Sequence, residues 1–342
     1  MESVVGVDNV CAWPNLTLLP DGAIVATIFN QPCHGLWEGD VECWASGDEG
    51  RTWTLRGVPA AHEPTTNRMN VAAGLAHDGR LVVLASGWSK RNPAGDPSPP
   101  HEGEVLPIRV CLSEDGGKSW ASDGSVIVPD SIPGAWIPFG DIVTLPDGEH
   151  GVCLYSFDRP AGTSGSHWFV SDAAARTWRH AGTVRQENAT ETTPVVTADG
   201  TLLAALRTTG DQHLELFAST DHGRTWTERG AVSGPRQHPG HLLRLEDGRL
   251  LFACGVRTPQ NSFLGIDVRL SADGGASWSD ARRLAASGHA PDARWPASDG
   301  GYPSTVACAD GTLVTAYYTS HSTASERYHM AVVRWRLEEI IA

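Results

Sequence analysis

Six segments of the chain repeat one pattern, in which an Asp-Gly pair separates two runs of strand-forming residues. Asp-Gly between alternating apolar residues is the strongest short-range signal for a β-hairpin, because the tight turn needs backbone conformations that these two residues tolerate. The turn aspartates are Asp21, Asp78, Asp147, Asp199, Asp247 and Asp310. Their spacing leaves each unit at least the roughly 40 to 50 residues of a four-stranded blade. The pattern therefore predicts an all-β chain folded as a six-bladed β-propeller.

A second repeat, Ser-x-Asp-x-Gly-x-(Thr/Ser)-Trp, follows most of these hairpins. Intact copies begin at Ser46, Ser113, Ser219 and Ser271, and a degraded copy begins at Ser171. In such a box Asp accepts backbone N–H groups, Gly supplies a positive φ, and Trp packs against the neighbouring unit. We therefore assign the boxes a structural role. The degraded copy, in which Ala173 and Ala175 replace Asp and Gly, is expected to make a looser turn.

The chain has no Pro/Gly/Ser-rich linker, and 40% of its 342 residues are hydrophobic, which is enough for one large core. We expect a single domain over residues 1–342. The last blade lacks a box, and its segment 328–337 is expected to pair with the amino-terminal segment 4–7, which closes the ring and leaves no open sheet edge. The proline-rich stretch 89–104 is expected to form a long loop in blade 2, either bordering a ligand-binding mouth or lying as a solvated surface loop.

Composition excludes several classes of protein. The net charge of −14, spread over dispersed carboxylates, argues against nucleic acid and anionic membranes as partners. No window approaches the roughly 18 apolar residues of a membrane span, and the start of the chain lacks the pattern of a signal peptide, so we expect a cytoplasmic protein. The seven cysteines are scattered and include no CxxC pair, so neither a disulfide framework nor a metal site is predicted, and no cofactor is expected.

Because blades repeat in space, residues at equal distance from each turn Asp occupy equivalent positions around the axis. Eight residues before the turn Asp, where the innermost strand of each blade begins, the chain carries Trp13, Asn70, Phe139, Glu191, Pro239 and Tyr302. We call this set the mouth ring. Eight residues after the turn Asp, blade 4 carries Arg207, so Glu191 and Arg207 should flank one mouth.

Here the chain resembles the sialidase (neuraminidase) family over essentially its whole length. The resemblance rests on the boxes, on ETTPVVTADGTLLAALR in blade 4 and on GYPSTVACADGTLVTAYY in blade 6. It implies that Tyr302 is the nucleophile, that Glu191 is the base that activates it, and that Arg207 belongs to the arginine cluster that holds a substrate carboxylate. A tyrosine suits this task, because an anionic nucleophile would be repelled by a carboxylate on the anomeric carbon.

The chain departs from the family at the general acid. The aspartate that the family places about a dozen residues before the first box is matched here by His34, with Glu38 and Asp40 close behind. A histidine exchanges protons near neutral pH, so His34 preserves a proton-transfer role, and Glu38 and Asp40 stay candidates beside it.

The chain also departs from the family at the arginine cluster. Where sialidases carry an Arg-Ile-Pro element, this chain reads Ala-Trp-Pro, so Trp13 is expected either to stack on a sugar ring or to belong to the core. Arg257 is the nearest candidate for the third arginine, and Arg68 is a possible substitute for a missing one. His238 is expected near the mouth as a binding residue, but its HxxH spacing with His241 does not set two nitrogens on one face of a strand, so no metal site is predicted.

These observations predict an exo-acting glycoside hydrolase of the sialidase type that releases a terminal, acidic sugar from a glycan. Two alternatives stay open. His34 and the incomplete arginine cluster suit a polysaccharide lyase or a hydrolase of uronic-acid or rhamnose linkages. A noncatalytic carbohydrate-binding propeller has the same fold, since fold alone does not establish activity.

Overall fold

The computed structural model describes residues 1–35, 37–91, 103–287, 300–320 and 328–340. Nearly all regular structure in these residues is β, and one short 3₁₀ helix, η1 (Leu337–Glu339), follows the last strand. Most of the predicted loop 89–104 falls at 92–102, outside the described residues. No helix in the described part of the chain has the length and apolar character needed to cross a membrane.

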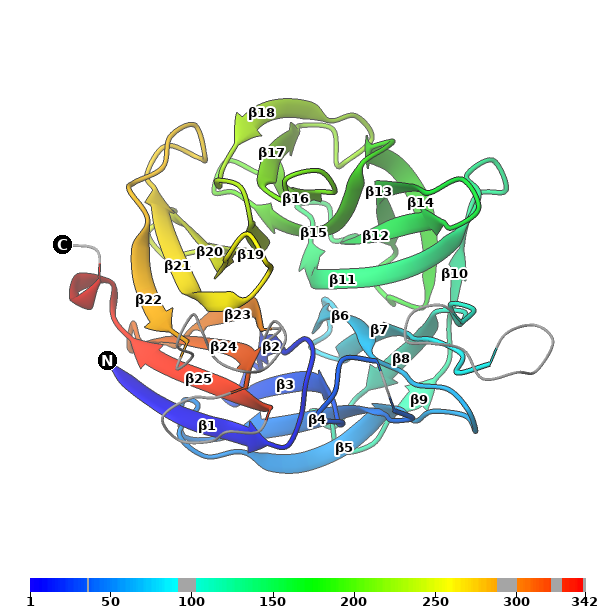
Figure 1. Ribbon diagram of the computed structural model, residues 1–342, viewed down its shortest axis with the longest axis horizontal. Coiled ribbons are helices and arrows are strands. Elements are labelled where there is room, and N and C mark those ends of the chain that lie inside the picture. The colour runs from blue at the N-terminus through cyan, green and yellow to red at the C-terminus, as the bar shows by residue number, and fades with distance from the viewer. Residues whose placement is uncertain (36, 92–102, 288–299, 321–327, 341–342) are drawn as a thin grey trace.

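The strands form six four-stranded units arranged around a central axis (Figure 1), which confirms the predicted propeller fold. Blades 1 and 2 contain β2 (Asn15–Leu18), β3 (Ile24–Phe29), β4 (Val41–Ser46) and β5 (Thr54–Ala60), then β6 (Asn70–Leu75), β7 (Leu81–Ser86), β8 (Arg109–Ser113) and β9 (Ala121–Ser122). Blade 3 contains β11 (Ala135–Thr144), β12 (His150–Asp158), β13 (Thr163–Ser171) and β14 (Thr177–Arg185), with β10 (Ser125–Ile127) parallel to β14.

Blades 4 to 6 follow the same plan. Blade 4 contains β15 (Ala189–Val196), β16 (Leu202–Thr208), β17 (Leu214–Ser219) and β18 (Thr227–Ala231). Blade 5 contains β19 (Gln237–Arg244), β20 (Leu250–Arg257), β21 (Phe263–Ser271) and β22 (Arg282–Ala286). Blade 6 contains β23 (Gly301–Ala307), β24 (Leu313–Thr319), β25 (His329–Trp335) and, from the start of the chain, β1 (Glu2–Asp8). Each predicted Asp-Gly turn joins the first two strands of its blade, and the first strand lies next to the axis (Figure 1).

Two kinds of contact join neighbouring blades. Strands β6 and β11 pair in parallel, which connects blades 2 and 3 into one nine-stranded sheet. Elsewhere apolar side chains from adjacent blades pack together, as where Leu251 of blade 5 and Val333 of blade 6 share one cluster. Burial of this apolar surface between blades is the main force that stabilises the ring.

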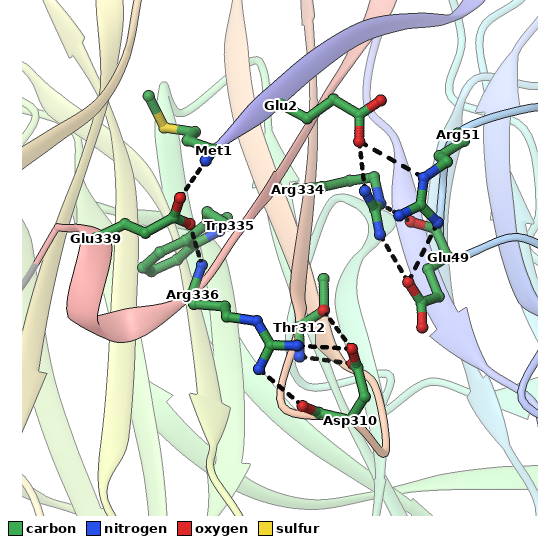
Figure 2. A pocket seen from close by; sticks show the side chains of 10 residues that line it. All are labelled: Met1, Glu2, Glu49, Arg51, Asp310, Thr312, Arg334, Trp335, Arg336 and Glu339. Atoms are coloured by element: carbon green, nitrogen blue, oxygen red, sulfur yellow. Dashed lines mark hydrogen bonds and ion pairs between the residues drawn. The ribbon is translucent and has the colours of Figure 1, made fainter.

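The ring is closed by antiparallel pairing of β1 with β25, from Glu2 opposite Arg334 to Asp8 opposite His329. Charged side chains reinforce this closure (Figure 2). Arg334 pairs with Glu2 and with Glu49, and Arg336 pairs with Asp310 at 2.8 Å. The two ends of the chain thus lie in one sheet, in which β1 is the outermost strand and covers the edge that β25 would otherwise expose.

The boxes make the predicted turns. In the box of blade 5, Asp273 accepts hydrogen bonds from the backbone N–H of Ser277 at 2.8 Å and from its hydroxyl, and these bonds lower the pKa of Asp273 to about 2. The degraded copy keeps the bond from Trp178 Nε1 to the carbonyl of Ala175, at 3.1 Å. Its Ser171 hydroxyl, however, is buried without a hydrogen-bond partner among the described residues. The degraded box therefore lacks the serine hydrogen bond of the intact copies but keeps the tryptophan bond.

Candidate active site

Three predicted residues meet at one end of the axis. The Tyr302 hydroxyl donates a hydrogen bond of 2.8 Å to Oε1 of Glu191, and Arg207 Nη1 donates one of 2.9 Å to the same oxygen. Arg207 Nη1 also lies 3.5 Å from the Tyr302 hydroxyl. Residues more than a hundred positions apart in the sequence are thus brought into direct contact, as the mouth ring predicted.

Bulges at the starts of β15 and β23 aim these side chains. Between the paired positions Ala189–Thr208 and Thr192–Leu206, β15 holds two residues, Thr190 and Glu191, opposite the single residue Arg207. Strand β23 has the same extra residue at Tyr302 and Pro303, between the pairs Gly301–Tyr318 and Ser304–Ala316. Bulges of this kind are common beside active sites, where they redirect a side chain.

The backbone of Tyr302 is strained. Its φ is 55°, in the left-handed region that side chains with a Cβ rarely adopt, and the preceding Gly301 has a φ of 102°. Such a conformation costs on the order of 1–3 kcal/mol and persists only where the surrounding structure imposes it, most often at functional sites. The strain therefore supports a functional role for Tyr302.

Glu191 and Arg207 form a buried ion pair, with side-chain exposures of 9% and 17%. Burial by itself would raise the pKa of Glu191, but the charge of Arg207 and hydrogen bonds that include the one from Tyr302 outweigh burial and lower it. Burial likewise opposes the charge of Arg207, and the Glu191 carboxylate overcomes this and raises the pKa of Arg207. Glu191 is therefore a carboxylate at neutral pH, able to accept the proton that Tyr302 presents to it.

Aromatic rings surround the Tyr302 side chain. Trp13 stacks on Tyr302 with ring centroids 5.1 Å apart and an interplanar angle of 26°. The His34 ring contacts Trp13 edge-on, with ring centroids 5.4 Å apart and an interplanar angle of 84°. Phe139 contacts Tyr302 at 5.9 Å from blade 3. Trp13, the residue next to the position where a sialidase carries an arginine, is thus part of an aromatic wall that contacts both Tyr302 and His34.

A cavity of about 320 Å³ opens over this wall, at the lower end of the size range of small-molecule sites. Among the predicted catalytic residues, it is lined by Tyr302, Glu191 and His34. The predicted binding residues that line it are Arg207, Arg257, Trp13 and His238. The structure thus brings seven of the ten predicted site residues to one cavity.

Glu38 and Asp40 do not line the cavity, because each is held by partners in its own region. Oε2 of Glu38 accepts the backbone N–H of Thr65 at 3.0 Å, and the Glu38 side chain is 48% exposed. Oδ1 of Asp40 lies 2.6 Å from His62 Nδ1 and accepts the His62 backbone N–H. Of the three predicted candidates for the general acid, His34 is therefore the one placed at the cavity.

Arg68 is likewise placed away from the cavity. It is buried in a hydrogen-bonded pair with Glu63 at 2.9 Å and donates to the carbonyl of Pro107 at 2.8 Å. Its guanidinium is held by these partners, so Arg68 does not replace the arginine that the Ala-Trp-Pro segment lacks.

Four further residues line the cavity: Asn70, Trp88, Tyr155 and Asn261. Asn70 belongs to the mouth ring, is fully buried, and has neither of its amide atoms hydrogen-bonded within the described residues. Tyr155 of blade 3 lies eight residues after its turn Asp, as Arg207 does in blade 4. The offset that predicts Arg207 at the mouth therefore also predicts Tyr155 there. Burial and then the Glu191 carboxylate raise the pKa of Tyr155 well above its usual value, so it is a neutral hydrogen-bonding group.

The mouth ring alternates in character around the axis. Blades 2, 4 and 6 contribute Asn70, Glu191 and Tyr302, whereas blades 1, 3 and 5 contribute apolar side chains, Trp13, Phe139 and Pro239. Of these six, Asn70, Glu191, Tyr302 and Trp13 line the cavity, so polar groups from three blades and one aromatic face meet there. This is the arrangement expected of a site that holds a small, partly polar molecule.

A second cavity, of about 330 Å³, lies at the closure of the ring (Figure 2). Its charged side chains form ion pairs with one another, as Arg334 does with Glu2 and Glu49. No trio of His, Cys, Asp or Glu side chains in the described residues is arranged to hold a metal ion. The cavity over Tyr302 is therefore the candidate active site.

The fold of this propeller is of the sialidase type. A family model described as "BNR repeat-like domain" matches residues 22–315. The chain therefore belongs to the BNR repeat-like family. Comparison with curated proteins finds no match.

Solved structures share this fold. A Dyadobacter fermentans DSM 18053 protein of unknown function is similar with a TM-score of 0.80 and 24% identity, over 98% of this chain and 97% of that one. The Hadza microbial sialidase Hz136 has a TM-score of 0.73 and 18% identity, over 97% of this chain and 66% of that one. The Trypanosoma rangeli sialidase has a TM-score of 0.69 and 15% identity, over 97% of this chain and 55% of that one. The chain thus spans about two thirds or less of these two sialidases.

Proposed function

We propose that this protein is an exo-acting glycoside hydrolase that releases a terminal, acidic sugar from a glycan, with Tyr302 as nucleophile. The observation that carries the proposal is the pair of hydrogen bonds that Tyr302 and Arg207 donate to one oxygen of Glu191. A phenol held against a buried carboxylate is an activated nucleophile, because the carboxylate takes its proton as attack begins.

In the first step, Tyr302 Oη attacks the anomeric carbon while Glu191 accepts the phenolic proton. The glycosidic bond breaks, and the leaving oxygen takes a proton from His34, which lines the same cavity. In the second step, His34 accepts a proton from water as that water attacks the anomeric carbon. The bond to Tyr302 breaks, and Glu191 returns the proton to the phenolic oxygen.

The charge of the cavity supports an acidic substrate. Arg207 and Arg257 contribute two guanidinium groups to its lining, whereas Glu191 contributes one carboxylate. Guanidinium groups recognise carboxylates by charge-assisted hydrogen bonds of matching geometry, so a substrate that carries a carboxylate suits this lining. The Trypanosoma rangeli sialidase, whose fold this chain shares, has been solved with 2,3-difluorosialic acid as a covalent intermediate. That likeness supports the proposal of a sugar acid that bonds to Tyr302.

Trp13 and His34 favour a second candidate, a lyase or hydrolase that acts on uronic-acid or rhamnose linkages. An Ala-Trp-Pro segment in place of Arg-Ile-Pro removes one contact for a carboxylate on the anomeric carbon and adds an aromatic face beside it. A uronide carries its carboxylate elsewhere on the ring, and a lyase needs no glycosyl-tyrosine.

The deciding experiment is a panel of terminal sialosides, their deaminated analogues, uronides and rhamnosides, with the anomeric configuration of the product followed by NMR. Release of the sugar with retained configuration supports the Tyr302 mechanism. An unsaturated product that absorbs in the near ultraviolet identifies the lyase. Tight binding without turnover at high protein concentration identifies a noncatalytic binding propeller and overturns the proposal.

A further inference from the structure

A second ring of side chains lies two residues beyond the mouth ring on the same innermost strands. We call it the axial ring: Asn15, Ala72, Asp141, Thr193, His241 and Ser304, each six residues before its turn Asp. Five of its six members are polar, although this part of the propeller is largely buried. Buried polar groups are costly unless they are hydrogen-bonded, so the partners of these side chains need to be identified.

Three members of the axial ring, Asn15, Asp141 and His241, are connected to one another by hydrogen bonds. Asn15 Nδ2 donates to the carbonyl of Gly140 at 3.0 Å and to Oδ1 of Asp141 at 2.9 Å. His241 Nε2 lies 2.9 Å from the other carboxylate oxygen, Oδ2 of Asp141. These contacts join blades 1, 3 and 5 directly across the axis.

Three atoms of the ring are buried without a hydrogen-bond partner among the described residues: Asn15 Oδ1, Thr193 Oγ1 and His241 Nδ1. Their side chains, with exposures of 6%, 1% and 4%, line one small cavity beneath Trp13 and Tyr302. The volume that the centre of a water-sized sphere can reach there is about 20 Å³. On that measure roughly 10–15 Å³ holds one water molecule.

The hydrogen-bonding character of the three atoms follows from their neighbours. Because Nδ2 of Asn15 donates to two oxygens, Oδ1 can only accept. Nε2 of His241 faces a carboxylate and therefore carries a proton; in the corresponding neutral tautomer, Nδ1 is an acceptor. The Thr193 hydroxyl is able to donate. The set therefore needs a partner that donates twice and accepts once.

We propose that Asn15, Thr193 and His241 bind one ordered water molecule on the propeller axis. The water donates its hydrogens to Asn15 Oδ1 and His241 Nδ1 and accepts the hydrogen of Thr193, which gives it the three bonds typical of a buried water. Through Thr193, the water connects blade 4 to blades 1, 3 and 5, which the contacts of Asp141 already join. The innermost strands of blades 1, 3 and 4, at whose starts Trp13, Phe139 and Glu191 lie, are thereby tied together one layer below the mouth ring, whatever reaction the site performs.

A matched pair of variants tests the proposal by thermal unfolding. Thr193→Val keeps the shape of the side chain and removes its hydroxyl, so the water loses one bond and the melting temperature should fall by about 2 °C. Thr27→Val is the control, because the Thr27 hydroxyl is also buried without a partner among the described residues but does not line the axial cavity. Its melting temperature should stay the same or rise. Equal effects of the two substitutions overturn the proposal.

A high-resolution crystal structure gives the second test. We expect one density peak at about 2.7–3.0 Å from Asn15 Oδ1, Thr193 Oγ1 and His241 Nδ1. A cavity without density, or side chains that turn to bond one another directly, overturns the proposal. A peak with ligand distances near 2.0–2.4 Å and anomalous scattering also overturns it, because it identifies a metal ion instead.

Discussion

Tyr302 and Arg207 donate to the same oxygen of Glu191, at 2.8 and 2.9 Å, although they reach it from different blades. One carboxylate oxygen thus accepts hydrogen bonds from a phenol, which we propose as the nucleophile, and from a guanidinium cation. The cation keeps the carboxylate ionised in a buried site, and this is the form that accepts a proton from Tyr302. The predictions below separate these two contributions.

Tyr302→Phe should leave the fold intact and lower kcat by about 10³-fold or more, because the aromatic packing is kept and the nucleophilic oxygen is lost. The measurement is steady-state turnover of the substrate found in the panel. Tyr317→Phe is the matched control in the same blade, since Tyr317 is buried but does not line the cavity. Equal turnover by the Tyr302 variant and the wild type would show that Tyr302 is not the nucleophile.

Breaking the Glu191–Arg207 pair should destabilise the protein. Glu191→Gln leaves the guanidinium buried without its carboxylate, and Arg207→Met leaves the carboxylate without its cation, so each should cost about 3–5 kcal/mol in the free energy of unfolding. The double variant should cost less than the sum, because it leaves no unpaired charge. Urea unfolding of all four proteins measures this coupling. Additive losses would mean that the contact contributes nothing to stability.

The pH dependence of kcat/KM should reveal the lowered pKa of Glu191. The base is active when ionised, so activity falls as the pH drops through the pKa of Glu191. Because the folded protein lowers that pKa, the acid limb should lie below the usual pKa of glutamate, about 4.3. Arg207→Met removes the main lowering influence and should move the limb to higher pH. An acid limb unchanged in this variant would assign it to another group.

His34→Gln should slow the release of poor leaving groups by about 10²–10⁴-fold and have little effect on activated aryl glycosides, which leave without a proton. Comparison of kcat/KM for an alkyl and an aryl glycoside measures this difference. His222→Gln, in the box of blade 4, is the control, because His222 does not line the cavity. Equal losses on both substrates would mean that His34 binds the sugar and does not protonate the leaving group.

Ala173→Asp should repair the degraded box. The new carboxylate would accept the hydroxyl of Ser171, which has no partner among the described residues, together with the N–H of Thr177. Intact boxes make these bonds, as Asp48 does with Ser46 and Thr52. A gain of about 1 kcal/mol in unfolding free energy is expected. Ala174→Asp is the control, since its side chain occupies the wrong position of the turn, and equal effects would contradict the assignment of the box.

The sequence by itself determined the blades and the equivalence of positions around the axis. Asp-Gly turns and boxes act through local backbone conformation, so their spacing alone indicates six hairpins and puts Glu191 and Tyr302 in one ring. The repeat also predicts that Asn70, eight residues before its turn Asp, and Tyr155, eight residues after its turn Asp, lie at the mouth, but it does not indicate their roles.

Only the tertiary structure decided which charged groups face the cavity. His34, Glu38 and Asp40 lie within seven residues on one loop, and no periodic pattern distinguishes them. Contacts from distant segments separate them, since Asp40 pairs with His62 and Glu38 bonds to Thr65, while His34 packs against Trp13. Arg68 is held by the nearby Glu63 and by the carbonyl of Pro107 from a more distant segment. Loop side chains are placed by partners that local sequence does not encode, whereas strand side chains follow the repeat.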